Sequence, residues 1–460
     1  MPLTRRTFLA ACSLSIASAA LPAFATDGTR KNVICILGDD HRGDALGCAG
    51  HPFLQTPNLD RLAHEGVRFS NACVTSAICC ASRAGILTGM HPARHRVIDF
   101  NTPIRDEDWP LTYPQLFRAN GYRTGFFGKY GVNGNNAPAD GFDEVLGEIY
   151  DGAYFPNDNP GARHADDLHC EAAEKFIEAQ AAAGQAFCVS LSFQSSHAID
   201  YAEKPYQPAP EFQSLYSDIA VPHAQDRGAP GYEVLPVFLR ENEGRKRYLH
   251  NFGGEDRYQD SVKNYYRMIT GLDAYIGRLR TTLERTGVAA NTLIVYMGDN
   301  GYFLGERGLE GKWYAYEQSI RVPLIVFDPT VPPEARGRVD ERFANECDIS
   351  PTLLDFAGIA IPGKIQGRSL RTPLAPDASN WRQDFLYHHH FKHPAIPRSE
   401  AVVSREWKYI RWLDGAPGFE ELYNLRTDPW ERANLANNPV HADTRESMRM
   451  RHYALLSEMA

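Results

Sequence analysis

The chain has 460 residues, of which 43% are hydrophobic and 23% are charged, and its formal net charge at pH 7 is −9. This composition is typical of a globular protein that can bury a large core. The acidic balance argues against nucleic acid as a partner, and an anionic substrate would need a local cationic pocket because the net charge of the chain does not attract it.

The first 25 residues have the pattern of a twin-arginine export signal. Arg5 and Arg6 precede an apolar run without acidic residues, and residues 23–25 (Ala-Phe-Ala) form a small-x-small cleavage site. A membrane anchor and a lipid on Cys12 are the alternatives, but the apolar run is short and interrupted at Pro22, and Cys12 lies too close to the arginines. We therefore expect a periplasmic or secreted protein that has no membrane contact after the signal is cleaved.

Short apolar runs alternate with helical patterns along the rest of the chain. Such runs are typical of strands buried on both faces, so the alternation predicts an α/β fold. Cys35 and Cys188, two of the nine cysteines, lie in these runs as expected buried thiols, and the cysteine spacing is not that of a zinc site. The expected strands are residues 32–38, 124–128, 187–193, 292–297 and 323–327.

Two helices have clear sequence signals. Thr56 followed by Pro57 predicts an N-cap and a first helical residue, and Gly66 predicts the end of that helix. In residues 256–285, apolar side chains recur in steps of three and four. This spacing predicts a long amphipathic helix that packs on the sheet.

The pattern changes twice in the second half of the chain. Six prolines from residue 198 to residue 236 exclude long regular elements and predict an extended surface segment, of a kind that often shapes substrate pockets. We expect a large domain over residues 26–365 and a smaller α+β subdomain with an antiparallel sheet over residues 366–460. The expected strands of the subdomain are residues 401–403, 408–412 and 421–423.

Two polar pairs follow expected strands. Asp39 and Asp40 come directly after the first strand, and Asp299 and Asn300 follow the strand at 292–297. The carboxyl ends of strands are where open α/β sheets bind ligands, and oxygen-only ligands suit a hard cation, with Ca²⁺ favoured over Mg²⁺ because it tolerates irregular coordination. Either pair alone could be a simple turn, since acidic residues and glycine are common there.

A third segment, residues 79–89 (CCASRAGILTG), resembles the signature of the sulfatase family. Ala81 stands where proline is more frequent in that family. The alternative, a buried cysteine at the start of a helix, does not account for the match over eleven residues. Residues 421–435 are also similar to a closing segment common in sulfatases.

The resemblance implies a fold, a cofactor and a nucleophile. The fold would be the alkaline-phosphatase-like one, a large mixed sheet flanked by helices. Cys79 would be oxidised by a formylglycine-generating or sulfatase-maturating enzyme to formylglycine (3-oxoalanine), whose hydrate is the nucleophile. Arg83 would brace this group and neutralise charge. The residues that match the family's ligands for one calcium ion are Asp39, Asp40, Asp299, Asn300 and the modified Cys79.

The same resemblance assigns three further catalytic residues. Lys129 and Lys312 match the lysines that hold the sulfate oxygens, whose charge spreads in the transition state. His197 matches the histidine that protonates the leaving alcohol. Taken alone, each lysine would be read as a solvated surface residue and the histidine as a structural one.

Two positions depart from the family pattern. Gly131 stands where many sulfatases have a histidine, and Ile199 stands where many have proline. The first departure removes the usual partner of the formylglycine hydrate. The candidates to replace that partner are Asn133, His95 and Asp299.

Residues 388–390 are three consecutive histidines. On a strand only His388 and His390 can share a face. A surface cluster or strand end is one interpretation and a substrate subsite is another, whereas a zinc site has no second cluster in the sequence to support it.

The resemblance, with the residues that match it, implies hydrolysis of sulfate esters. A sulfated carbohydrate is favoured as substrate over an aryl sulfate because export suits the use of extracellular glycans. A phosphonate monoesterase or phosphodiesterase with the same machinery is the first alternative. The second, a binding protein that has lost catalysis, would be expected to lack the nucleophile or the metal ligands, and both are present.

Overall fold

The computed structural model describes residues 30–156, 159, 161–224, 229–371 and 380–460. The predicted export signal, residues 1–25, lies outside the described residues. Residues Lys31–Ala460 form one compact unit. Within the described residues, no helix is both long and apolar enough to span a membrane.

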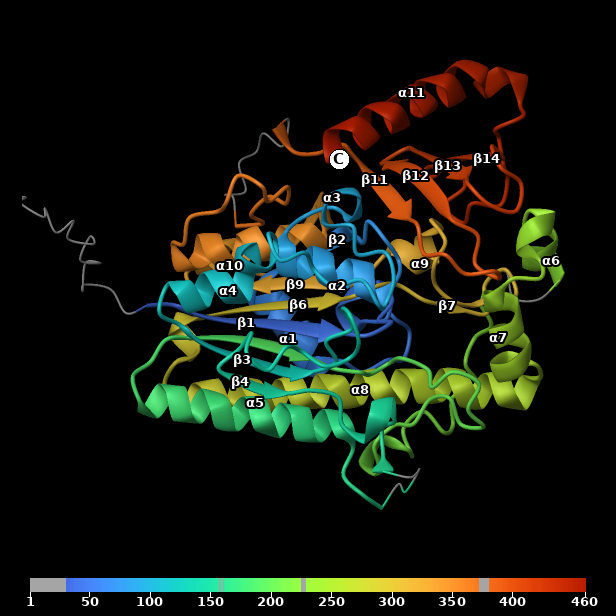
Figure 1. Ribbon diagram of the computed structural model, residues 1–460. Helices are drawn as coiled ribbons and strands as arrows, with labels where there is room; N and C mark the ends of the chain where they lie inside the picture. The colour runs from blue at the N-terminus through green and yellow to red at the C-terminus, as the bar shows by residue number, and fades with distance from the viewer. Residues whose placement is uncertain (1–29, 157–158, 160, 225–228, 372–379) are drawn as a thin grey trace, which may run out of the picture. The chain divides into compact units, whose positions relative to one another are not determined.

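A mixed sheet of eight strands forms the centre of this unit, in the order β10-β2-β9-β6-β1-β5-β3-β4 (Figure 1). β9 runs antiparallel to both of its neighbours and the other adjacent pairs are parallel. All five strands predicted for this domain are confirmed, whereas β2, β4 and β10 were not predicted. The strands are β1 (Asn32–Gly38), β2 (Val67–Cys73), β3 (Arg123–Gly128), β4 (Glu144–Leu146), β5 (Phe187–Ser192), β6 (Thr292–Gly298), β9 (Leu324–Phe327) and β10 (Arg338–Asn345).

Helices cover both faces of this sheet, which explains why its central strands are apolar throughout. In β1, Ile34 and Ile36 pack on the face covered by α1 (Pro57–Glu65), α5 (Ala165–Ala182) and α8 (Glu255–Arg285). Val33 and Cys35 point to the other face, covered by α2 (Cys79–Thr88), α4 (Tyr113–Ala119) and α10 (Ile349–Ala357). The long helix predicted at 256–285 is confirmed as α8, and Figure 1 shows it along one face of the sheet.

The remaining helices and a short hairpin connect these layers. From residue 198 to residue 236 the described residues form only two short helices, a 3-10 helix at Pro210–Phe212 and α6, so the predicted absence of long elements is confirmed. All eight described cysteines are free, and Cys35 and Cys188 are buried as predicted. The other elements are α3 (Pro92–His95), α6 (Ala229–Glu233), α7 (Glu243–Phe252), α9 (Glu317–Ile320), β7 (Phe303–Leu304) and β8 (Glu310–Gly311).

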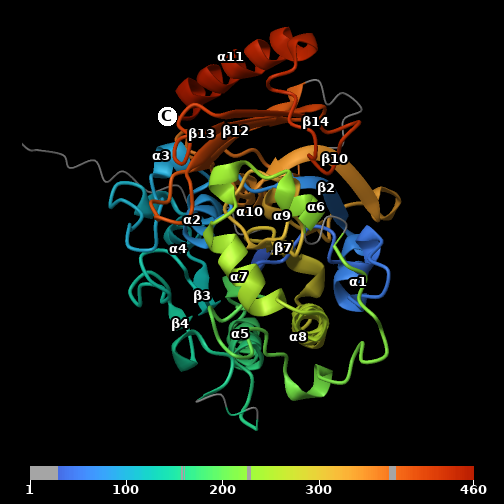
Figure 2. The same cartoon turned by 90° about the vertical axis from the view of Figure 1, so that its right-hand side faces the viewer.

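A second, antiparallel sheet lies near the C-terminus, with α11 (Ala442–Met459) on one face (Figures 1 and 2). On that face Leu386 and Val402 pack against Leu455 of α11. On the other face Tyr387 and Trp412 join the core of the large sheet, so the apolar core is continuous between the two sheets. Three of the four strands were predicted, and the domain boundary at 366 stays a prediction. The strands are β11 (Asp384–His389), β12 (Ser399–Ser404), β13 (Trp407–Trp412) and β14 (Glu420–Asn424).

The start of α1 differs from the prediction. Thr56 is the residue before the helix, but its side chain caps no helical N–H; its hydroxyl instead accepts a hydrogen bond from Gly47 N, at 2.8 Å. Asp273 of α8 caps the start of this helix instead, because its carboxylate accepts hydrogen bonds from Leu59 N at 2.7 Å and Asn58 N at 3.2 Å. A carboxylate from a distant helix therefore replaces the local cap and joins α1 to α8.

We predict that Asp273→Ala lowers the free energy of unfolding by about 1–3 kcal/mol, because two N–H groups at the start of α1 lose their acceptor in a buried place. Urea denaturation followed by circular dichroism measures this change. Asp260→Ala, at an exposed position of the same helix, is the control and should change stability by less than about 0.5 kcal/mol. Equal effects of the two substitutions would refute the assignment of Asp273 as the cap.

Candidate active site

The two polar pairs lie side by side because of strand register. β1 and β6 are adjacent and parallel, and Gly38 at the end of β1 is opposite Gly298 at the end of β6. The next residues of both strands therefore leave the same edge of the sheet. A hydrogen bond of 3.0 Å from Asp40 N to Asp299 Oδ1 joins the two pairs directly.

The carboxylates form a compact cluster of potential ligands. One oxygen each from Asp39, Asp40 and Asp299 and the sulfur of Cys79 all lie within 4.8 Å of one another. Asn300 donates to Asp40 Oδ1 through Nδ2, while its buried Oδ1 has no hydrogen-bond partner among the described residues. An unpartnered buried oxygen beside three carboxylates fits a hard cation such as Ca²⁺.

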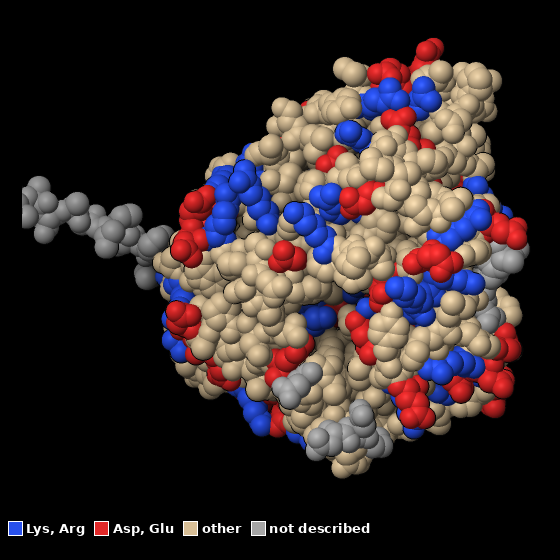
Figure 3. Space-filling view, turned by 45° about the vertical axis from the view of Figure 1, so that its right-hand side comes forward, with Lys and Arg blue, Asp and Glu red and all other residues tan. Residues whose placement is uncertain are grey.

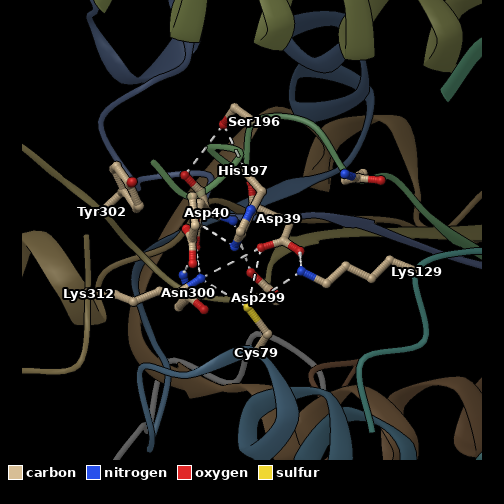
Figure 4. A network of polar contacts seen from close by, with 12 residues as sticks. Asp39, Asp40, Cys79, Lys129, Ser196, His197, Asp299, Asn300, Tyr302 and Lys312 are labelled. Carbon is tan, nitrogen blue, oxygen red and sulfur yellow. Dashed lines mark hydrogen bonds and ion pairs between the residues drawn. The ribbon is translucent and has the colours of Figure 1, made fainter. Parts of the chain in front are cut away.

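Cys79 is the first residue of α2, a helix whose ten residues are all buried. Its sulfur lies 3.0 Å from Lys312 Nζ, 3.4 Å from Asp39 Oδ1 and 4.0 Å from Lys129 Nζ (Figure 4). Burial, together with the negative charges of Asp299 and Asp39, raises the pKa of the thiol well above its usual value. The thiol is therefore protonated at neutral pH and is a poor nucleophile as it stands.

Arg83, one turn further along α2, holds the carboxylates in place. It donates from Nε to Asp299 Oδ2 at 2.8 Å and from Nη2 to Asp39 Oδ2 at 3.1 Å. Its Nη1 donates to Lys129 O and to Ser192 Oγ. The hydrogen bonds of Arg83 thus reach the acidic residues and not Cys79. Of its two predicted roles, these contacts support the neutralisation of the carboxylates.

Lys129 and Lys312 complete the positive side of the cluster. Lys129 follows β3 and its Nζ lies 2.5 Å from Asp39 Oδ2, whereas Lys312 follows β8 and its Nζ lies 2.5 Å from Asp40 Oδ1. Both side chains are buried, unlike solvated surface lysines. Burial alone would raise the pKa of Asp39, but the charges of Lys129, Arg83 and Lys312 hold it well below its usual range.

His197 follows β5, the strand between β1 and β3, and its side chain is 23% exposed. Its Nε2 lies 3.8 Å from Asp40 Oδ2. Burial and then the charge of Lys129 lower the pKa of His197 well below its usual value, so the free imidazole is neutral. A bound anion would offset that positive charge and favour the protonated form.

The sequence did not reveal two residues that support His197. Asp166 of α5 accepts hydrogen bonds from Gln194 N at 2.9 Å and Ser195 N at 3.0 Å, which fixes the loop before His197. Arg247 of α7 lies near enough for its charge to contribute to the lowered pKa of His197. An acidic residue in a first helical turn and an arginine in a helix have too little local signal to be linked to a distant loop.

The structure separates the three candidates for the partner that Gly131 lacks. Asp299 lies in the cluster with Cys79, whereas Asn133 is exposed. His95 is buried with a pKa lowered to about 3, chiefly by burial, and has no hydrogen bond to the cluster. Gly131 has a φ of +70°, and a Cβ there would lie 2.8 Å from Cδ of Arg83, so any side chain would collide with that arginine.

Acidic and basic side chains are mixed on the face drawn in Figure 3, where the surface is hollowed near its centre. The cluster itself contains three carboxylates, those of Asp39, Asp40 and Asp299. Against them stand three cations, Arg83, Lys129 and Lys312. A divalent cation would release the lysines from the carboxylates, and their ammonium groups could then bind the oxygens of an anionic ester.

Comparison with known proteins identifies the family to which the chain belongs. The family model described as sulfatase matches residues 31–359, and the one described as N-sulphoglucosamine sulphohydrolase, C-terminal, matches residues 305–458. The N-acetylglucosamine-6-O-sulfatase of Bacteroides thetaiotaomicron is 26% identical, with 95% of this chain and 88% of the relative covered.

Two solved structures have the same fold. One, of a protein in complex with its substrate D-glucosamine-2-N,6-O-disulfate, has a TM-score of 0.79 at 24% identity and covers 94% of this chain and 98% of the other. The phosphonate monoester hydrolase of Agrobacterium radiobacter has a TM-score of 0.76 at 22% identity, with 94% and 96% covered. Since the sulfatase model spans well over half of the chain, the protein belongs to the sulfatase family, sulfuric ester hydrolases with the alkaline-phosphatase-like fold.

Proposed function

We propose that this sulfatase hydrolyses a sulfate ester of a carbohydrate, using a formylglycine made from Cys79 and one bound Ca²⁺. The observation that carries the proposal is the single buried cluster in which Cys79 meets two acidic pairs and two lysines. Relatives that act on sulfated sugars, among them the N-acetylglucosamine-6-O-sulfatase and an ulvan-active sulfatase of Formosa agariphila, support the carbohydrate substrate.

The environment of Cys79 supports a modified residue. A neutral thiol beside two carboxylates cannot attack an anionic ester, and a sulfated cysteine would have no easy route to release sulfate. A hydrated aldehyde supplies one hydroxyl to attack sulfur and a second whose deprotonation expels the sulfate. In this proposal the sulfur atom of Cys79 marks the place of the attacking oxygen.

The calcium ligands would be Asp39, Asp40, Asp299 and Asn300, with residue 79 completing the set. Their oxygens are the donors that Ca²⁺ prefers, and the unpartnered Oδ1 of Asn300 is free to join them. When bound, the ion would act as a Lewis acid and lower the pKa of the nucleophilic hydroxyl. Arg83 keeps Asp39 and Asp299 fixed in this arrangement.

The remaining residues would act on the substrate and its protons. Lys129 and Lys312 lie within 4.0 Å of the sulfur of Cys79, close enough to bind oxygens of a sulfate group attacked from that position. His197, on the same side as Asp40, would donate its proton to the leaving alcohol oxygen. Of the three candidates for the second deprotonation, we favour Asp299, because it alone lies within the cluster.

The location and maturation of the protein are also proposed. The sequence at residues 1–25 supports export by the twin-arginine route, to the periplasm or the outside of the cell. The unmodified cysteine at position 79 requires a formylglycine-generating or sulfatase-maturating enzyme as a partner. After signal cleavage we expect no membrane contact and no nucleic-acid partner.

If Cys79 becomes formylglycine, Cys79→Ala should abolish turnover of a sulfate ester while the circular dichroism spectrum is unchanged. Mass spectrometry of the active protein should find the peptide with residue 79 lighter than its cysteine form. The neighbouring Cys80, also buried in α2, offers the matched control: Cys80→Ala should retain the lighter peptide and most of the activity. Full activity with an unmodified Cys79 peptide would disprove the proposed nucleophile.

Calcium binding should weaken as the pH falls through about 7. In the metal-free chain, burial raises the pKa of Asp40 to about 7, with Asp39 and Asp299 adding to the rise against the opposing charge of Lys312. Below that pH a proton competes with the ion, so the Kd for Ca²⁺ should rise by about tenfold per pH unit. Isothermal titration calorimetry in buffers of different ionisation enthalpy measures both the affinity and the proton released.

Two controls belong to the calcium experiment. Asp40→Asn should bind Ca²⁺ more weakly and without this proton release. Exhaustive chelation should suppress turnover, and added Ca²⁺ should restore it. Full turnover after chelation would contradict the metal assignment.

Because a phosphonate monoester hydrolase has the same fold, hydrolysis of a phosphonate ester is the rival reaction to test. Matched aryl sulfate and aryl phosphonate esters should be compared with a panel of sulfated saccharides, with kcat/KM as the measure. We expect the highest kcat/KM for a saccharide sulfate and a lower one for the aryl sulfate. A kcat/KM that is highest for the phosphonate would overturn the proposed reaction. A kcat/KM that is highest for the aryl sulfate would overturn only the proposed carbohydrate substrate.

A further inference from the structure

Three side chains of the types that bind metal ions meet on the α11 face of the small sheet. His388 lies on β11 and His390 two residues later, so both point to the same face. Glu400 of β12 is directly opposite His388 in the antiparallel register. One ligand atom from each of the three residues lies within 4.8 Å of the other two.

The two imidazole rings are held close together. They stack with ring centroids 3.6 Å apart and planes 20° apart. Two nitrogens bound to one tetrahedral zinc ion at about 2.05 Å lie about 3.4 Å from each other. One ligand nitrogen of each ring already lies within 4.8 Å of the other. To bind one ion, the rings would have to turn out of this stack, because the lone pair of each nitrogen lies in the plane of its own ring.

His388 carries a polar atom without a partner. The side chain is 8% exposed, and its Nδ1 accepts and donates no hydrogen bond among the described residues. A buried nitrogen in this state costs free energy unless something outside the chain binds to it or near it. His390 is 27% exposed at its side chain, so an ion and a water molecule can reach the cluster from solvent.

The third ligand is already oriented by its neighbours. Glu400 Oε1 lies 2.8 Å from His390 Nε2, and Glu400 Oε2 lies 2.9 Å from Nε2 of His452 on α11. Ligating carboxylates in metal sites are commonly fixed by such an outer hydrogen bond. His91 packs its ring against His388, with centroids 6.0 Å apart, and is itself tied to Leu386 O.

We propose that His388, His390 and Glu400 bind a divalent transition-metal ion of the zinc class, separate from the calcium site. Two imidazole nitrogens and one carboxylate oxygen suit Zn²⁺ better than the oxygen-preferring Ca²⁺, and water supplies the fourth position. The ion replaces the His390–Glu400 hydrogen bond. His390 then binds the ion through Nε2.

The ion would fasten the C-terminal helix to the small sheet. It would join β12 to the end of β11, and Glu400 would transmit this link to α11 through His452. Leu455 is the apolar side chain of α11 that is fully buried on this face, and Met448, Leu456 and Met459 pack beside it at partial burial. The proposed site thus has a structural role and does not depend on the sulfatase reaction.

Cobalt titration of the full mature chain tests the proposal. The protein is stripped of transition metals, saturated with Ca²⁺ to fill the catalytic cluster, and titrated with Co²⁺. A tetrahedral site with imidazole ligands gives Co²⁺ an intense visible absorption band, whereas a six-coordinate oxygen site gives a weak one. We expect one equivalent of Co²⁺ with the intense band, and its loss when Zn²⁺ is added.

Variants locate the bound ion. His390→Gln and Glu400→Gln should each remove the band, and His452→Ala should retain it with a Kd higher by about 10–100-fold, as for loss of an outer partner. His393→Gln, at an exposed histidine close by, is the matched control and should bind Co²⁺ as the unaltered chain does. Unchanged far-UV circular dichroism and sulfate-ester turnover of His390→Gln establish that the variant is folded.

Two results would overturn the proposal. One is an unaltered chain that shows no intense band at saturating Co²⁺. The other is a band that persists in folded His390→Gln. In either case His390, Glu400 and His452 form only a hydrogen-bonded group. Neither result bears on Cys79 or on the calcium site, which the peptide mass and the chelation experiment test separately.

Discussion

Three buried carboxylates at one edge of the sheet are the constraint on which the rest of this molecule depends. Asp39, Asp40 and Asp299 are at most 1% exposed, and ionised carboxylates in such a place are very costly unless cations face them. Arg83, Lys129 and Lys312 provide that charge at distances of 2.5 to 3.1 Å. The cluster is therefore electrostatically balanced before any ion or substrate arrives.

This balance ties the fold to the site. The charged groups come from separate elements: the ends of β1, β6 and β3, the hairpin β7–β8 and the middle of α2. Only the strand order β6-β1-β5-β3 places these ends next to one another, with His197 after β5 between them. A change of register at any of these strands would leave a carboxylate or a lysine buried without its partner, so the ion pairs that assemble the cluster also favour this fold.

The sequence predicted those parts whose signal is local. Continuous apolar runs identified the central strands, because a strand buried on both faces needs no polar residue, and the steps in residues 256–285 identified α8. β2 and β10 mix polar with apolar residues and were missed. The cap of α1 could not be predicted, because Asp273 is more than 200 residues away from it. Likewise, the candidate catalytic residues were identified by family resemblance, whereas Asp166, which fixes the loop before His197, was not.

At Gly131, where many sulfatases have a histidine, the side chain of Arg83 fills the space beside the backbone. Arg83 lies against this glycine, and the collision of any Cβ with Cδ of Arg83 ties the two positions together. A histidine at 131 would therefore require Arg83, or the backbone around residue 131, to shift from its place in this structure. Asp299 is the acceptor that we propose for the second proton, and it also accepts hydrogen bonds from Arg83 and Asp40 N. These hydrogen bonds fix the position of the Asp299 carboxylate, so the same contacts that assemble the cluster also place the proposed acceptor beside residue 79.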